Sequence, residues 1–176
     1  LKNAAFFAMD IRDVTPALGT FDYIISHGLY SWVPPEVRDS LLEVSRANLA
    51  PNGVAYVSYN TYPGWHMLQG LREMMLYHIR HETDGHQRAE KARELIALLA
   101  RSVADERNQA YGTFIDSYRE LLEKQVQDGR PHIDSVILHD ELAEWNDPVY
   151  FSQFAAHAQA HGLQFLVESD FPMSMP

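Results

Sequence analysis

The sequence predicts an α/β fold with a mainly helical insertion or second region. Short apolar runs alternate with one helix pattern over residues 1–60, as is typical of an open sheet. Over residues 61–145, apolar residues instead recur at helical spacing. A helix pattern followed by one apolar run returns over residues 146–176. We therefore expect the first and third segments to belong to one α/β domain, with the helical segment inserted in it or packed on it.

The first segment contains three predicted strands. Apolar runs at residues 4–9 and 21–25 are expected to be buried strands, because turn-forming or polar residues follow each of them. A helix is predicted from the two prolines at 34–35 to the Pro-Asn-Gly turn at 51–53. The β-branched and aromatic run 54–59 follows as a third strand. This order favours a parallel pair with a right-handed crossover.

Three amphipathic helices are predicted in the second segment, over about residues 67–79, 89–103 and 111–122. Turn-forming residues separate them near 84–85, and again shortly before the third helix. The segment 133–145 fits no single element. The charged faces of these helices are typical of ordinary solvated surfaces.

The third segment begins with a predicted helix over residues 151–160. Asp147 and Ser152 are candidates for its N-cap, and Gly162 is expected to end it. The apolar run 163–167 is expected to be a further strand.

Composition and charge exclude several classes of function. The 176 residues include 14 Lys and Arg against 24 Asp and Glu, for a formal net charge of −10, and no Cys. Thiolate chemistry and cysteine zinc sites are therefore excluded. An acidic chain is a poor match for nucleic acid or an anionic membrane, so we expect no nucleic-acid partner, no membrane span and a cytoplasmic location. The chain begins at Leu1 and runs almost directly into a strand-like segment, so we expect it to be a piece of a longer protein.

Candidate functional residues lie where the predicted strands end, because ligands of open α/β sheets gather at the carboxyl ends of the strands. Asp10 could hydrogen bond to an adenine or a ribose, or cap the next turn. His27 could be a general base or line a cofactor, or be a partly buried histidine bonded to backbone. Aromatic residues at the same ends could stack on a base or face a cation, or form the edge of the core: Tyr30, Trp32, Tyr62 and Trp65.

Two histidine pairs have helical spacing. His78 and His81 lie three residues apart beside Glu82, and His157 and His161 lie four apart. Neither pair has further ligands close by in the sequence, so we predict no metal site. The sequence also contains no serine-hydrolase elbow, no Walker loop and no glycine-rich strand-to-helix loop.

Three stretches resemble the downstream half of a class I S-adenosylmethionine-dependent methyltransferase. They are MDIRDV (9–14), FDYIISHGLYSWVP (21–34) and LLEVSRANLAPNGVAYVSYN (41–60). In that family an acidic residue after the third strand faces the adenine, and Asp10 matches it. The turn before the fifth strand matches the family pattern with Asn52 in place of a glycine.

Two further stretches, YNTYPGWH (59–66) and HDELAEWNDPVYFSQF (139–154), resemble the bacterial subgroup that carries a methyltransferase regulatory domain. The stretch HGLQFLV (161–167) is similar to the segment that leads into the sixth strand. The resemblance implies a partial Rossmann-like methyltransferase sheet over residues 1–60, a helical or regulatory region over 61–145, and a return to the sheet over 146–176.

The resemblance also implies S-adenosylmethionine as the cofactor. The family's glycine-rich motif and its acidic ribose-binding residue are missing, so the chain alone is expected to lack half of the cofactor site and to be inactive. Cofactor contacts carry over only to Asp10, Ile11, Ser26 and His27. If the methyl acceptor carries a proton, the candidate bases are His27, Tyr30 and His66.

The resemblance leaves the acceptor open between a small molecule and a protein. The helical region is expected to act as a lid, a substrate platform or a regulator. Two alternatives remain: a non-catalytic regulatory or interaction module of a methyltransferase, and an NAD-linked oxidoreductase, which fits the FDYIIS and LAPNG segments less well.

Overall fold

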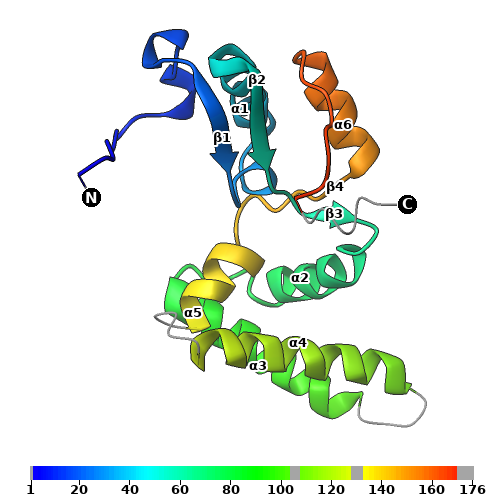
Figure 1. The fold of residues 1–176 in the computed structure, drawn as a ribbon. Coiled ribbons are helices and arrows are strands. Elements are labelled where there is room, and N and C mark those ends of the chain that lie inside the picture. Colours follow the sequence, from blue (N-terminus) through cyan, green and yellow to red (C-terminus); the bar gives the residue numbers. More distant parts are fainter. Residues whose placement is uncertain (1, 104–107, 128–132, 170–176) are drawn as a thin grey trace. The chain divides into compact units, whose positions relative to one another are not determined.

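The computed structural model describes residues 2–103, 108–127 and 133–169 of the chain, and Figure 1 traces them. The fold is mixed α/β, mostly helical, with small parallel sheets. The chain forms two compact units, one made of Leu1–Trp65 with Trp145–Pro176 and the other of His66–Glu144. The first unit is thus discontinuous in the sequence.

Two parallel strands and one helix form the centre of the first unit. Strand β1 (Phe21–Ser26) pairs with β2 (Leu49–Val57), and α1 (Pro35–Asn48) connects them. The predicted crossover helix and its two flanking strands are therefore confirmed as elements. The predicted turn at 51–53 is wrong, because these residues lie within β2. The strands approach closely at Gly53, where a Cβ atom would lie 2.9 Å from the carbonyl oxygen of Phe21. Only glycine allows this approach without moving β1.

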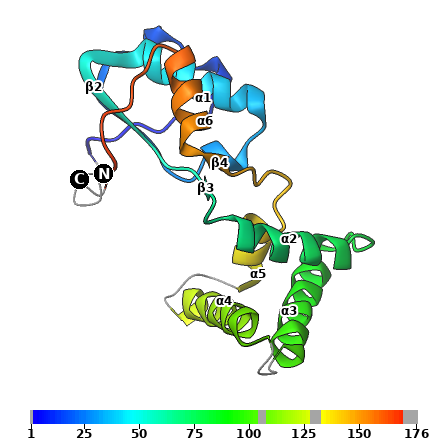
Figure 2. The same cartoon turned by 90° about the vertical axis from the view of Figure 1, so that its right-hand side faces the viewer.

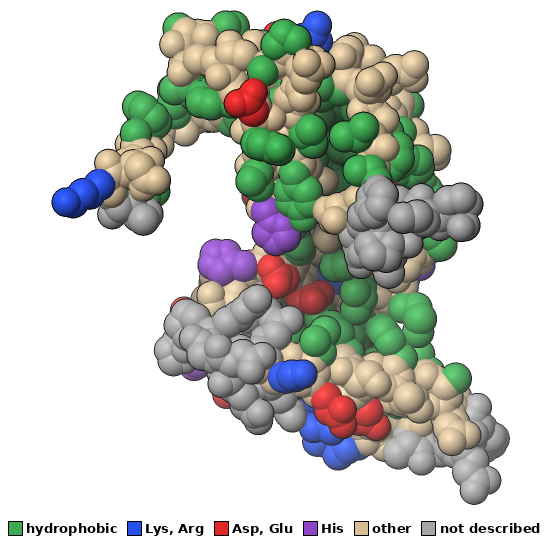
Figure 3. Space-filling model, in the orientation of Figure 1, with side chains coloured by type: hydrophobic (Ala, Val, Ile, Leu, Met, Phe, Trp, Pro, Cys, Tyr) green, Lys and Arg blue, Asp and Glu red, His purple; other side chains and the backbone are tan. Residues whose placement is uncertain are grey.

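Strand β1 is exposed on one face, contrary to the expectation of a buried strand. Tyr23 is 75% exposed and Ile25 is 74% exposed, whereas Ile24 and Ser26 point to the opposite face and are partly or fully buried. Hydrophobic side chains are correspondingly visible at the surface of this unit (Figure 3). The sequence pattern of β1 is apolar on both sides, but within the described residues only one of its faces is covered.

Two predicted strands are wrong. Residues 4–9 and 163–167 have no regular secondary structure, and their large apolar side chains, such as Phe6 and Leu166, are exposed. A strand exists only when a neighbour accepts its backbone hydrogen bonds, and none of the described strands pairs with either run. Two short 3-10 helices, Ile11–Asp13 and Pro16–Leu18, follow the first run.

The chain returns to the first unit through a short strand and a helix. Strand β4 (Val149–Tyr150) pairs in parallel with β3 (Thr61–Tyr62), and α6 (Phe151–Ala160) follows. The predicted helix and its end at Gly162, which has φ of +73°, are confirmed. The predicted N-caps Asp147 and Ser152 are wrong.

The N-cap of α6 is instead Tyr150, whose backbone N–H donates to the side chain of Gln153 in a capping box. Asp147 is paired with Arg38 of α1 at 2.7 Å, so its carboxylate serves a contact between segments that are distant in the sequence.

Four polar residues hold the two segments of the first unit together, near the points where the chain leaves this unit and returns to it. The Asp147 N–H donates to the Ser31 carbonyl at 2.9 Å, and the Asn60 N–H donates to the Ser31 hydroxyl at 2.8 Å. The side chains of Asn60 and Asn146 are hydrogen bonded at 3.3 Å. We call Ser31, Asn60, Asn146 and Asp147 the hydrogen-bonded clasp.

The second unit is helical (Figure 2). It contains α2 (His66–His78), α3 (Gly85–Ser102), α4 (Gln109–Gln127), the short α5 (Ile133–Val136) and a π-helix (Ile137–Glu141). The three predicted amphipathic helices are confirmed, and their apolar faces share one core that includes Met75, Ile96, Ile115 and Leu122. Asp84 caps α3 by accepting a hydrogen bond from the Gln87 N–H.

Candidate functional site

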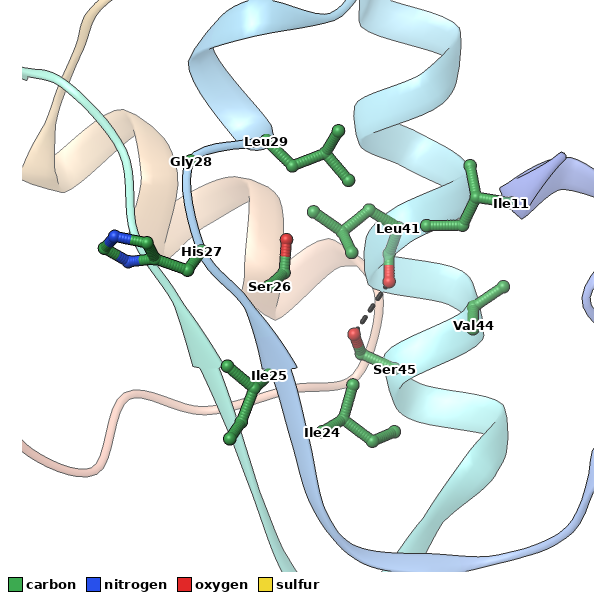
Figure 4. A pocket seen from close by; sticks show the side chains of 10 residues that line it. All are labelled: Ile11, Ile24, Ile25, Ser26, His27, Gly28, Leu29, Leu41, Val44 and Ser45. Carbon is green, nitrogen blue, oxygen red and sulfur yellow. Dashed lines mark hydrogen bonds between the residues drawn. The ribbon is translucent and has the colours of Figure 1, made fainter. Parts of the chain in front are cut away.

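A pocket of about 390 Å³ lies at the carboxyl end of β1. Its wall combines the end of β1, the loop after it and one face of α1, and Ile11 closes one side (Figure 4). The lining residues are Ile11, Ile24, Ile25, Ser26, His27, Gly28, Leu29, Leu41, Val44 and Ser45. Three of the four residues expected to contact a cofactor, Ile11, Ser26 and His27, therefore lie around one pocket.

The two serines of this pocket differ in their hydrogen bonding. The Ser45 hydroxyl donates to the Leu41 carbonyl of its own helix at 2.7 Å (Figure 4). The Ser26 hydroxyl is buried and has no hydrogen-bond partner among the described residues. A buried hydroxyl without a partner is unfavourable by about 1–3 kcal/mol, so Ser26 is suited to bond a polar group of a ligand.

His27 lies at the rim of the pocket. In Figure 4 its ring points away from Ile11 and Leu41. The ring stacks beside Tyr56 of β2, with centroids 6.1 Å apart, and its Nδ1 lies 3.4 Å from the Tyr56 hydroxyl. The next residue, Gly28, has φ of +67° and open space around it. The side chain of His27 is exposed.

Asp10 lies outside the lining of this pocket. Its carboxylate caps the first 3-10 helix by accepting from the Arg12 N–H at 2.9 Å, and it pairs with the Arg12 guanidinium at 2.7 Å. Hydrogen bonds from Arg12 lower the pKa of Asp10 to about 2. Asp10 therefore caps the first 3-10 helix in this structure.

Tyr30 is a core residue. It is 3% exposed, and its ring packs edge-on against Phe154 with centroids 5.1 Å apart. Its hydroxyl is hydrogen bonded to Nδ1 of His157 at 2.8 Å and is absent from the pocket lining. Burial raises the pKa of Tyr30 above its usual value. Tyr30 is thus a neutral group that fixes the orientation of His157.

The expected aromatic concentration is split between different contacts. Tyr30 and Tyr59 belong to the core around α6, where Tyr59 stacks on Phe154 at 4.1 Å and burial raises its pKa to about 12. Tyr62 instead packs against Tyr150 across the β3–β4 pair, at 5.5 Å. Trp32 and Trp65 are both partly buried.

His66, the third candidate base, begins α2 and belongs to the helical unit, whereas His27 and Tyr30 belong to the first unit. Its side chain is exposed.

A histidine cluster that sequence spacing could not complete lies between α1 and α6. His157 and His161 are joined by Asp39, which comes more than a hundred residues earlier. Among the residues whose placement is described, no other group of three such side chains has the spacing of a metal site, and the His78–His81 pair belongs to none. The helical spacing of His157 and His161 was the available signal.

Two charged side chains are buried in the helical unit. Arg72 of α2 is 7% exposed and Glu141 of the π-helix is 9% exposed. Burial raises the pKa of Glu141, while Tyr118 and Arg72 lower it by less. Burial likewise lowers the pKa of Arg72. The Tyr118 side chain lowers the pKa of Glu141, although its hydroxyl makes no hydrogen bond of standard geometry with the described residues.

Within the part of the chain that the structure describes, no helix is both long and apolar enough to cross a membrane.

Comparison with known proteins relates the chain to bacterial proteins that are longer than it is. It is 39% identical to the uncharacterized protein RP789 of Rickettsia prowazekii, over 96% of this chain and 29% of the relative. It is 36% identical to RP028 of the same organism, over 94% of this chain and 63% of the relative. The chain thus spans less than two thirds of each of these relatives. Residues 133–176 match the family described as a predicted methyltransferase regulatory domain.

Solved structures of PKMT2 from Rickettsia typhi are also similar. One matches with 38% identity and a TM-score of 0.67, over 87% of this chain and 27% of PKMT2. The other, a complex with AdoHcy, matches with 39% identity and a TM-score of 0.72, over 90% of this chain and 29% of PKMT2. The chain is therefore homologous to part of the Rickettsia methyltransferase PKMT2, and its last 44 residues match the predicted methyltransferase regulatory domain.

Proposed function

We propose that this chain is part of an S-adenosylmethionine-dependent protein lysine methyltransferase and that its first unit supplies part of the cofactor site. The observation that carries the proposal is the similarity, at 39% identity over 90% of the chain, to PKMT2 in a complex with AdoHcy. In this proposal β1, α1 and β2 are part of a Rossmann-like methyltransferase sheet. The β1 pocket then lies where such sheets bind their ligands, at the carboxyl ends of the strands.

The residues of the β1 pocket fit an adenosyl group. Ile11, Leu29 and Leu41 offer apolar walls for a flat ring, and the Ser26 hydroxyl offers an unused hydrogen-bonding group. Asp10 is not part of this lining and its carboxylate pairs with Arg12, so its contact with an adenine or a ribose stays a prediction. We therefore assign cofactor contacts to Ile11, Ser26 and the backbone of His27.

Bound S-adenosylmethionine supplies an activated methyl group. The chain's own residues would then position the acceptor and exclude water. A lysine ammonium must lose a proton before it can attack. Of the three candidate bases, His27 fits best, because its ring is exposed at the rim of the pocket, whereas the hydroxyl of Tyr30 is committed to His157.

Binding of AdoHcy tests this assignment. In the full-length protein, Ser26→Ala is expected to weaken AdoHcy binding about tenfold. This is the effect of losing one hydrogen bond to a ligand. Isothermal titration calorimetry measures it. Ser40→Ala is the matched control, since the Ser40 hydroxyl bonds its own helix on α1. Equal affinity of the two variants would reject the role of Ser26, and no AdoHcy binding by the wild type would reject the proposed function.

A second candidate, a non-catalytic regulatory module, is favoured by the match of residues 133–176, which include α5, the π-helix, β4 and α6. Methyl transfer measured with and without residues 66–144 distinguishes the roles of the helical unit. We expect its removal to abolish transfer to a protein acceptor, as for a lid or substrate platform. An unchanged rate and acceptor range would exclude both of those roles and a regulatory one.

A further inference from the structure

Three potential metal ligands meet between α1 and α6 in the first unit. The Nε2 atom of His157 lies 2.7 Å from Oδ1 of Asp39, and the Nε2 atom of His161 lies 3.7 Å from the same oxygen. All three donor atoms lie within 4.8 Å of one another. Two imidazoles and one carboxylate from two helices therefore converge on one point, which we call the α1–α6 histidine cluster.

The helix itself preorganises the two imidazoles. His157 and His161 are four residues apart, so they lie on one face of α6 and its C-cap, and their ring centroids are 5.1 Å apart. Histidines at this spacing can hold one metal ion together, as in helical zinc sites. Asp39 is 59% exposed on α1, so its carboxylate can change rotamer at little expense and an ion can reach the cluster from solvent.

The other side of the His157 ring is already fixed. Its Nδ1 is hydrogen bonded to the buried Tyr30 hydroxyl at 2.8 Å. Metal-binding histidines commonly donate their second ring N–H to an oxygen in this way, which sets the tautomer and directs the other nitrogen at the ion. In the tautomer whose Nδ1–H donates to Tyr30, the Nε2 lone pair points toward Asp39, and a cation can bind between these two groups.

We propose that the α1–α6 histidine cluster binds one divalent transition-metal ion of the Zn²⁺ type. An imidazole and carboxylate donor set suits Zn²⁺. Bonds of about 2.0 Å in a tetrahedral arrangement place neighbouring donors roughly 3.3 Å apart. The two distances to Asp39 bracket this value, and a movement of that exposed side chain can adjust them. Solvent completes the coordination.

Such an ion would link α6 directly to α1. Helix α6 lies in the segment that matches the regulatory domain, and α1 follows the strand that carries the β1 pocket. Metal occupancy would therefore stabilise the attachment of that segment within the first unit. This inference rests on the side chains alone and is independent of the proposed methyl transfer.

Calorimetric titration of the chelator-treated, metal-free protein with ZnCl₂ tests the site. We expect one Zn²⁺ per chain, and at least about tenfold weaker binding for Asp39→Asn and His161→Ala. These two side chains are not in the buried core, so we expect both variants to fold. Circular dichroism verifies it. Tyr30→Phe, which removes only the outer hydrogen bond, is expected to weaken binding about tenfold.

His81→Ala is the matched control, because His81 lies on the surface of the other unit and outside the cluster. It is expected to bind Zn²⁺ as tightly as the wild type. Titration with Co²⁺ should also give visible absorption bands of a low-symmetry site in the wild type and in His81→Ala only. If the wild type binds no Zn²⁺, or if Asp39→Asn and His161→Ala bind as tightly as His81→Ala, the site does not exist.

Discussion

Replacing Arg72 with methionine is expected to destabilise the protein by about 3–5 kcal/mol, because it removes a buried cation whose charge favours the ionised form of the buried Glu141. The variant also loses the hydrogen bond from the Arg72 guanidinium to the Ala143 carbonyl. Urea unfolding followed by circular dichroism measures the change. Arg80→Met is the matched control: Arg80 is exposed on the same unit, so a change within about 0.5 kcal/mol is expected.

The loss of stability in Arg72→Met should depend on pH, in a direction set by the pKa of Glu141. Burial raises the pKa of Glu141, so above its ordinary value of about 4.3 the folded state holds a proton that the unfolded state releases. Stability therefore falls as pH rises through the interval between the two values. Arg72 lowers the pKa of Glu141, so its removal widens this interval, and the effect of Arg72→Met should be larger at pH 8 than at pH 5.

A double replacement tests whether the loss of stability comes from the buried charge that remains or from altered packing. Arg72→Met with Glu141→Leu removes both buried charges and should recover most of the lost stability. Equal stability losses for Arg72→Met and Arg80→Met, or a loss that shrinks with rising pH, would contradict the importance of the pair.

The second large effect is expected in the core of the helical unit. Leu122 is 4% exposed, whereas its neighbour Leu121 on the same helix is 51% exposed. Leu122→Ala should lower the free energy of unfolding by about 2–5 kcal/mol, since it leaves a cavity among α2, α3 and α4. Leu121→Ala, the same chemical change at the adjacent position, should change it by less than about 0.5 kcal/mol. Similar values for the two variants in urea unfolding would show that the apolar face of α4 is not packed as described.

Local periodicity was enough to predict the helices. The stripes on α2, α3 and α4, the start of α1 and the bounds of α6 follow from residues that are neighbours in the sequence. The pairing of β1 with β2 follows for the same reason, because one helix connects them. Local order also placed Ser26 and His27 at the pocket, since they lie at and just after the end of β1. Ile11 follows the run 4–9, which is not a strand, and its place was implied only by the family resemblance.

Long-range pairing could not be predicted. The run at 4–9 has the composition of a buried strand, but a strand depends on a neighbour that its own residues do not specify. Asp39 and His157 are distant in the sequence and meet only because α6 packs on α1. Arg72 likewise looks like a surface charge in a helix pattern, and Glu141 lies in a segment that fits no single predicted element. Only the packed core of the unit reveals that both are buried.

The hydrogen-bonded clasp has a consequence for how this architecture could vary. Because Ser31, Asn60 and Asn146 fasten the outgoing and returning chain to each other, the connection closes at one point whatever lies beyond it. The entropy of closing a loop grows only slowly with its length. Helices could therefore be added to or removed from the segment beyond the clasp at small thermodynamic expense, and the α/β unit could keep its own fold while its insert changes in size.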